Sequence, residues 1–189
     1  NQSLCSQWTA PIFENGFIGR ADILQFFFYT RISYARGYGD KRDIGVQVTG
    51  NLPWIEYRAG LFNGEGINQT DKNDQKDYTG LLIFKPLQGL EIGGLGYRGR
   101  VGKTGTDKDR YGPELRYQYQ DLSFKGEAMW AKDEPIRSNG WYIQLGYFML
   151  PKELQGVLKY EGFDPDQSEP GNKEHDLTIG INYFVNGHN

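Results

Sequence analysis

The sequence is poor in the residues that build catalytic and metal sites. It has one cysteine, Cys5, and two histidines, His175 and His188, among 189 residues. One thiol makes no disulfide framework and no CxxC metal site. Both histidines fall in a predicted loop or tail, without a serine at a spacing typical of a nucleophile and its base. We therefore expect no enzyme, no cofactor and no metal, since a lone His175 between acids is usually solvated.

Long apolar runs and an excess of positive charge are also missing. No stretch approaches the roughly 18 consecutive apolar residues of a membrane-spanning helix, which excludes helical insertion but not a β-barrel. The net charge is −3, and lysine and arginine alternate with acids, which argues against a nucleic-acid partner. The chain begins at Asn1 without an initiator methionine or an apolar leader, which indicates a removed signal or a portion of a longer protein.

Aromatic residues and glycine are abundant, and a period of two arranges the apolar side chains. Residues 110–132 show this best: Tyr111, Leu115 and Tyr117 alternate with polar residues, and a tight connection at 120–121 leads into a second alternating arm. This pattern predicts a hairpin with one apolar and one charged face. Because any antiparallel sheet with one face in a core shares it, the rest of the chain must decide.

The alternation recurs along the chain and predicts about ten strands of roughly eight to twelve residues. At Gly93-Gly94 the apolar phase changes, which predicts a bulge. Short turns are expected to alternate strictly with longer polar loops, of which the loops fall at 62–77, 99–109, 133–139 and 164–174. The strands are expected at 2–13, 42–50, 55–61, 78–85, 90–97, 110–120, 122–132, 141–149, 154–161 and 177–185.

These features favour a membrane barrel over a soluble sandwich. Strands of about 9 to 11 residues cross a bilayer when tilted, with tight turns at one rim and longer loops at the other. We therefore expect an all-β, antiparallel, up-and-down transmembrane β-barrel that contacts outer-membrane lipid. Aromatic residues near strand ends are typical of a girdle at the membrane interface: Trp54, Tyr97, Tyr111, Trp130, Trp141 and Tyr183.

Periodicity alone does not decide which face is inside. The apolar face turns inward in a soluble lipocalin-like barrel that binds a small apolar ligand, and outward in a membrane barrel. The charged faces carry both signs, which suits the wall of a water-filled lumen, although ordinary exposed ion pairs are the alternative. The expected lumen-lining cations are Arg58, Arg116, Lys125 and Lys159, and the expected lumen-lining acids are Glu56, Glu114, Glu127 and Glu161.

Residues 14–41 have only a weak pattern and lie, by counting back from the short turns, at the rim of the long loops. A connection this long is uncommon unless it is functional. In a wide barrel such a loop can fold into the lumen and narrow it. Arg20, Arg31 and Arg36 would then line the path of an anion, with a solvated surface loop as the alternative.

Several stretches are distinctive in their order along the chain: RDIGVQVTG at 42–50, AGLFNG at 59–64, RYGPEL at 110–115, YIQLGYFMLPKELQGVLKYEGFDPD at 142–166 and LTIGINYFVNGHN at 177–189, with looser matches in APIFENG at 10–16 and LQFFFYTR at 24–31. Together they resemble the phosphate-selective porin O and P family.

The resemblance implies a sixteen-stranded, homotrimeric channel of the bacterial outer membrane that passes small inorganic anions such as phosphate. It also implies that the long third loop, here residues 15–41, forms the constriction. Thr30 stands where the family often has an acid before the arginine that matches Arg31, and the lumen-facing set is close to balanced in charge.

About ten strands is fewer than sixteen, and Asn186-Gly187 is typical of a type I′ hairpin turn. We therefore expect residues 1–189 to form one β-barrel domain that is incomplete at both ends. The predicted function is that of a porin for passive diffusion of small anions.

Overall fold

The computed structural model describes residues 19–22, 42–64, 74–101 and 105–184. In these residues ten strands form a single antiparallel sheet, and no helix is long and apolar enough to span a membrane. The strands are β1 (Gly19–Asp22), β2 (Arg42–Asn51), β3 (Ile55–Phe62), β4 (Asp77–Leu87), β5 (Leu90–Val101), β6 (Thr106–Tyr119), β7 (Leu122–Asp133), β8 (Ile136–Leu150), β9 (Leu154–Asp164) and β10 (Glu174–Tyr183).

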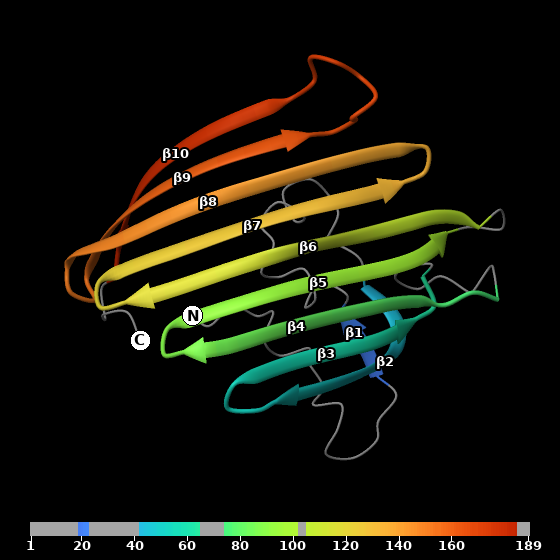
Figure 1. Ribbon diagram of the computed structural model, residues 1–189, viewed down its shortest axis with the longest axis horizontal. Helices are drawn as coiled ribbons and strands as arrows, with labels where there is room; N and C mark the ends of the chain where they lie inside the picture. The colour runs from blue at the N-terminus through green and yellow to red at the C-terminus, as the bar shows by residue number, and fades with distance from the viewer. Residues whose placement is uncertain (1–18, 23–41, 65–73, 102–104, 185–189) are drawn as a thin grey trace.

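The strand order follows the chain order, so each strand pairs with the one before it and the one after it (Figure 1). The predicted all-β, antiparallel, up-and-down fold is therefore confirmed. Within the described residues β1 and β10 are the two edges of the sheet, and closure into a barrel stays a prediction.

Alternation along each strand sorts the side chains onto two faces. In β8, Trp141, Ile143 and Leu145 point to one face, while Tyr142 and Gln144 point to the other. Because the strands pair in register, the same sorting continues from strand to strand. We call the face that carries Leu82, Tyr111, Leu145, Leu158 and Ile179 the apolar face, and the face that carries Glu56, Arg58, Glu114, Glu127 and Lys159 the charged face.

The apolar face is the exposed one. Leu82 is 55% exposed and Ile179 76%, whereas Glu114 and Glu127 on the charged face are only 5% and 6% exposed. The buried apolar residues also lie on the charged face, toward the rim of the long connections. They form one cluster of Phe62, Leu81, Ile83, Leu95 and Tyr97 and a smaller one of Met129 and Tyr142 against Phe163.

The bulge predicted at Gly93-Gly94 is wrong. Both glycines pair in an unbroken register with β4 and β6. The apolar pattern changes phase there because Leu95 and Tyr97 join the buried cluster on the charged face, not because the backbone gains a residue. The register instead shifts between Phe84 and Leu87, around Pro86, which has no N–H to donate.

The prediction that short and long connections alternate strictly is also wrong. Residues 102–105 alone join β5 to β6, and Glu134 and Pro135 join β7 to β8, so much of the predicted loops at 99–109 and 133–139 continues as paired strand. Cross-strand ion pairs support this polar sequence as strand: Arg100 Nε lies 2.6 Å from Asp107 Oδ1. Longer connections remain at 63–76 and 165–173.

The strand β1 lies inside the segment predicted to be the constriction loop. It pairs antiparallel with β2, and Arg20 lies opposite Ile44. This strand is not predictable from alternation, because its four residues, GRAD, are too few to show a period of two. The strand predicted at 2–13 and the remainder of the constriction segment, including Arg31 and Arg36, lie outside the described residues.

Candidate functional site

All eight predicted lumen residues of β3, β6, β7 and β9 lie on the charged face, and the register arranges them in rows across the strands. Glu114 lies opposite Glu127, which lies opposite Tyr142, which lies opposite Glu161. We call the carboxylates of this line the acid row: Glu56, Glu114, Glu127, Glu161 and Asp176.

The cations form a second row, one step nearer the short turns. Arg116 lies opposite Lys125, and Gln144 connects Lys125 to Lys159 across β8. We call Arg116, Lys125 and Lys159 the base row. Because opposite charges lie in parallel rows, the face carries a field along the strand direction, and the rows can pair with each other.

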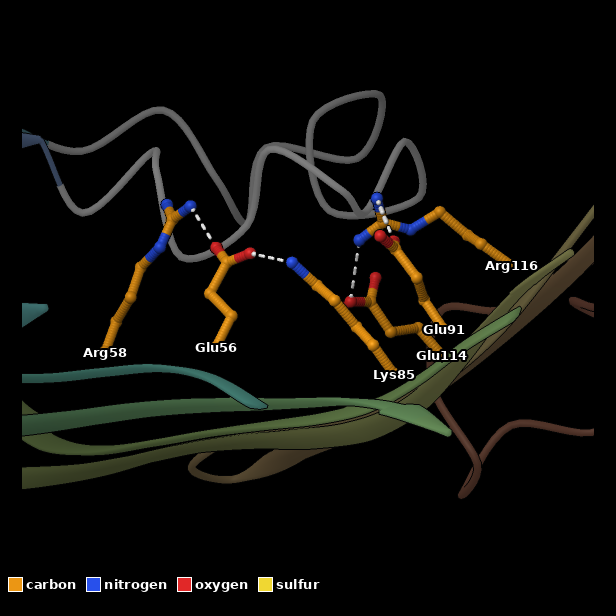
Figure 2. A network of polar contacts seen from close by, with 6 residues as sticks. All are labelled: Glu56, Arg58, Lys85, Glu91, Glu114 and Arg116. Carbon is orange, nitrogen blue, oxygen red and sulfur yellow. Dashed lines mark hydrogen bonds and ion pairs between the residues drawn. The ribbon is translucent and has the colours of Figure 1, made fainter. Parts of the chain in front are cut away.

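Glu56 is the centre of the first ionic group. Its Oε1 accepts a hydrogen bond from Arg58 Nη2 at 2.7 Å, and Lys85 Nζ lies 3.3 Å from Oε2 (Figure 2). Lys85 was missed in the sequence analysis because β4 is apolar on both faces around it. Its position is explained by the register, which brings the end of β4 beside the start of β3.

Arg116 is the centre of the second ionic group. Its Nη1 lies 3.1 Å from Glu91 Oε2, and its Nη2 donates to Glu114 Oε1 at 3.1 Å (Figure 2). Glu91 was also missed, because the pattern of β5 is irregular. Gly93 of β5 lies opposite Glu114 and leaves room for this group, because a Cβ at Gly93 would lie only 2.8 Å from Glu114 Cγ.

The third ionic group lies on β8 and β9. Lys159 Nζ donates to Glu161, and the same ammonium lies 5.1 Å from the ring centroid of Tyr142. A lysine over a tyrosine ring gains a cation–π attraction, so Lys159 is held by two neighbours. Arg58, Arg116, Lys125 and Tyr142 make further interactions, so none of them is free.

A cavity of about 610 Å³ opens at the short-turn end of the charged face. Lys85, Glu91, Arg116 and Lys125 line it, together with the turn between β4 and β5. Among the described residues, three cations and one acid therefore border a space large enough for small hydrated ions.

A fourth polar group lies toward the other rim. The Tyr97 hydroxyl donates to Asp77 Oδ2, and the Arg100 N–H donates to Asp77 Oδ1 at 3.1 Å. Arg110 Nη2 donates to both oxygens of Asp133 at 2.9 and 2.7 Å. This group was not predicted from the sequence, because Asp77, Arg100 and Asp133 fall in segments predicted to be loops.

Most of the predicted girdle lies on the apolar face. Tyr111 stacks on Trp130, and Trp54 meets Phe84 edge to face at 6.2 Å. Tyr97 is the exception: it is buried on the charged face, because it belongs to the apolar cluster beside Asp77. The prediction that Tyr97 contributes to the girdle is wrong.

The other residues considered as candidates for ion or metal binding are the arginines of residues 14–41 and His175. Arg20 pairs through its backbone in β1, and Arg31 and Arg36 lie outside the described residues. His175 is in β10 rather than in a loop, and its ring stacks on Tyr160 with centroids 6.0 Å apart. Among the described residues no three His, Cys, Asp or Glu side chains gather in a way that would hold a metal.

The chain matches no protein-family model and no curated protein, so the family resemblance seen in its sequence stays a prediction.

Proposed function

We propose that this chain forms the wall of an outer-membrane porin, through which small anions such as phosphate diffuse passively across a water-filled β-barrel. The observation that carries the proposal is the direction of the two faces. Large apolar side chains are exposed over the whole sheet, while the ionic side chains lie on the opposite face. Soluble monomers rarely expose a contiguous apolar patch above a few hundred Å², so such a face suits contact with lipid.

The alternative is a soluble lipocalin-like barrel that binds a small apolar ligand. Such a barrel directs its apolar residues inward and its charged residues to water. In this sheet the apolar side chains are exposed and the charged ones are buried: Leu145 is 44% exposed, and Glu127 on the neighbouring strand is 6% exposed. This contrast favours the porin.

The apolar face also carries aromatic residues near the strand ends. Trp54, Tyr111 and Tyr183 are 55%, 58% and 66% exposed. Tyrosine and tryptophan prefer the interface between hydrocarbon and water, where the ring is in apolar surroundings and the polar atom is hydrated. Their positions support a bilayer around the sheet.

The base row and the cavity beside it support anions as the permeant ions. In the part of the chain that the structure describes, Lys85, Arg116 and Lys125 border the cavity, together with one acid, Glu91. Passive diffusion needs no reacting group, only a polar wall that binds an ion weakly enough to release it. The proposal includes closure of the sheet, because an open strand edge leaves N–H and C=O groups without partners in lipid. It also includes a homotrimer, on the family resemblance alone.

Conductance of the full-length protein in planar bilayers tests the proposal. We expect stepwise current and reversal potentials that show preference for phosphate and chloride over potassium. Zero current, or a preference for cations, would contradict it. A refolded monomer that stays soluble without detergent would support the lipocalin-like alternative.

A further inference from the structure

Two carboxylates of the acid row lie directly opposite each other. Glu114 of β6 pairs in register with Glu127 of β7, and both side chains belong to the charged face. They are 5% and 6% exposed, so bulk water screens neither of them well. Like charges that face each other across two strands destabilise the pair, and two carboxylates in one buried site do not both ionise readily.

The hydrogen bonds distinguish the two acids. Glu114 Oε1 accepts from Arg116 Nη2 at 3.1 Å, so its negative charge has a cation beside it. Both carboxylate oxygens of Glu127 are buried without a well-formed hydrogen bond among the described residues, and the donor that acts on them is the hydroxyl of Tyr142 on the facing strand, which carries no positive charge. An isolated buried carboxylate costs far more than its neutral form, so such a group takes up a proton.

The surrounding charges do not supply Glu127 with a cation of its own. Arg116 already binds Glu91 and Glu114, and Lys159 donates to Glu161. The titratable and charged groups nearest the pair are Glu91 of β5, Arg116 of β6, Lys125 of β7, Tyr142 of β8, and Lys159 and Glu161 of β9. Glu56 of β3 and Lys85 of β4 lie farther away.

We infer that Glu127 is a proton-binding site, neutral at neutral pH, and that loss of its proton in alkali weakens the preference of the channel for anions. The second half rests on the proposed function. When the proton is lost, the acid row gains one negative charge directly beside Arg116, in the part of the face where the base row attracts anions. The anion preference is therefore expected to fall with rising pH.

Infrared spectroscopy of the protein in membranes tests the proton without any current. The wild type should show the carbonyl band of a protonated carboxylic acid at neutral pH. Glu127→Gln should lose this band, whereas Glu161→Gln should keep it, because Glu161 already bonds to Lys159. Absence of the band from the wild type, which would mean an ionised Glu127 balanced by another cation, or survival of the band in E127Q, would overturn the inference.

Glu114→Gln is a second variant, in case E127Q does not fold. It removes the facing negative charge and leaves Glu127 in place. The band of E114Q should therefore disappear at a lower pH than the band of the wild type, in which an ionised Glu114 faces Glu127. It should still disappear at a higher pH than the band of an exposed carboxylic acid. A band that disappears at the same pH in both proteins would contradict the coupling of the two carboxylates.

Reversal potentials from neutral to alkaline pH test the consequence. Wild type and E161Q should both lose anion preference as the pH rises, and E127Q should lack the component of the shift that Glu127 causes. The same pH dependence in wild type and E127Q would overturn the inference. A protein that passes no current contradicts the proposed function instead, and the infrared band still decides the state of Glu127.

Discussion

Tyr111 and Trp130 stack across β6 and β7, with ring centroids 5.7 Å apart and planes 17° from parallel. The two residues pair in register and point out from the apolar face, where they are 58% and 39% exposed. Stacked aromatic rings usually contribute their apolar area to a core. A stacked pair that is exposed instead is what the proposed membrane interface predicts for the apolar face.

Arginine scanning of β8 measures what surrounds each face. Leu145→Arg places a charge on the apolar face and should destabilise the protein in bilayers by about 2–4 kcal/mol, the cost of arginine near the bilayer midplane. Gln144→Arg, one residue away, places the same charge on the charged face, between Lys125 and Lys159. Repulsion from the two lysines makes it mildly destabilising, but it should cost less than Leu145→Arg because no charge enters hydrocarbon. Unfolding of both variants in lipid vesicles checks this, and equal costs would contradict a lipid-facing apolar side.

Arg116 is expected to be important for ion selectivity. Arg116→Gln leaves Glu91 and Glu114 without their shared cation, so reversal potentials should shift toward cations. Arg98→Gln is the control, because its side chain is 80% exposed and lies 3.9 Å from Asp109. Exposed ion pairs of this kind contribute little. Equal shifts in the two variants would mean that selectivity does not depend on the base row.

Gly89 is required by the turn between β4 and β5. Its φ is +82°, and a Cβ there would lie 2.0 Å from the Gln118 carbonyl oxygen. Gly89→Ala should therefore cost about 1–3 kcal/mol through backbone strain. Gly80→Ala is the matched control in β4, since its Cβ would have no atom within 4 Å. We expect a change within about 0.5 kcal/mol there. Thermal unfolding compares the two, and similar costs would refute the role of the turn.

Asp166 gives a pH-dependent prediction in the connection between β9 and β10. The Ser168 hydroxyl and N–H donate to Asp166 Oδ1 at 2.7 and 3.0 Å, and these hydrogen bonds lower the pKa of the carboxyl. Because the pKa is lower in the folded protein, these hydrogen bonds stabilise the fold above the pKa of an unfolded aspartate. This stabilisation is lost as the pH falls through the pKa of the folded protein. NMR titration should show this low pKa, and Ser168→Ala should raise it. An unchanged value in S168A would exclude Ser168 as the cause.

The sequence was sufficient to predict the faces of the regularly alternating strands, with β5 as the exception. Alternation places every second side chain on the same face, so Leu145 and Gln144 are separated by the backbone itself, whatever the rest of the fold. The strand ends were harder to predict. Arg100 and Asp107 look like loop residues in isolation, and only the register of β5 against β6 shows that they face each other.

The candidate site was predicted as a set of residues and not as an arrangement. The eight acids and bases of β3, β6, β7 and β9 were identified because they occupy the polar positions of regularly alternating strands. The partners of Glu56 and Arg116, namely Lys85 and Glu91, depend on strand pairing and were missed. Tyr97 was assigned to the wrong face because the sequence does not show which residues gather around Asp77.

Spin labelling along β8 tests most directly whether the apolar face touches hydrocarbon. Single cysteines at residues 142–147, in a Cys5→Ser background, would each carry a nitroxide in the reconstituted protein. We expect accessibility to oxygen, which concentrates in hydrocarbon, to be high at Ile143, Leu145 and Tyr147 and low at Tyr142, Gln144 and Gly146. The opposite phase, or access of a water-soluble paramagnetic reagent to the odd-numbered positions, would contradict the membrane barrel.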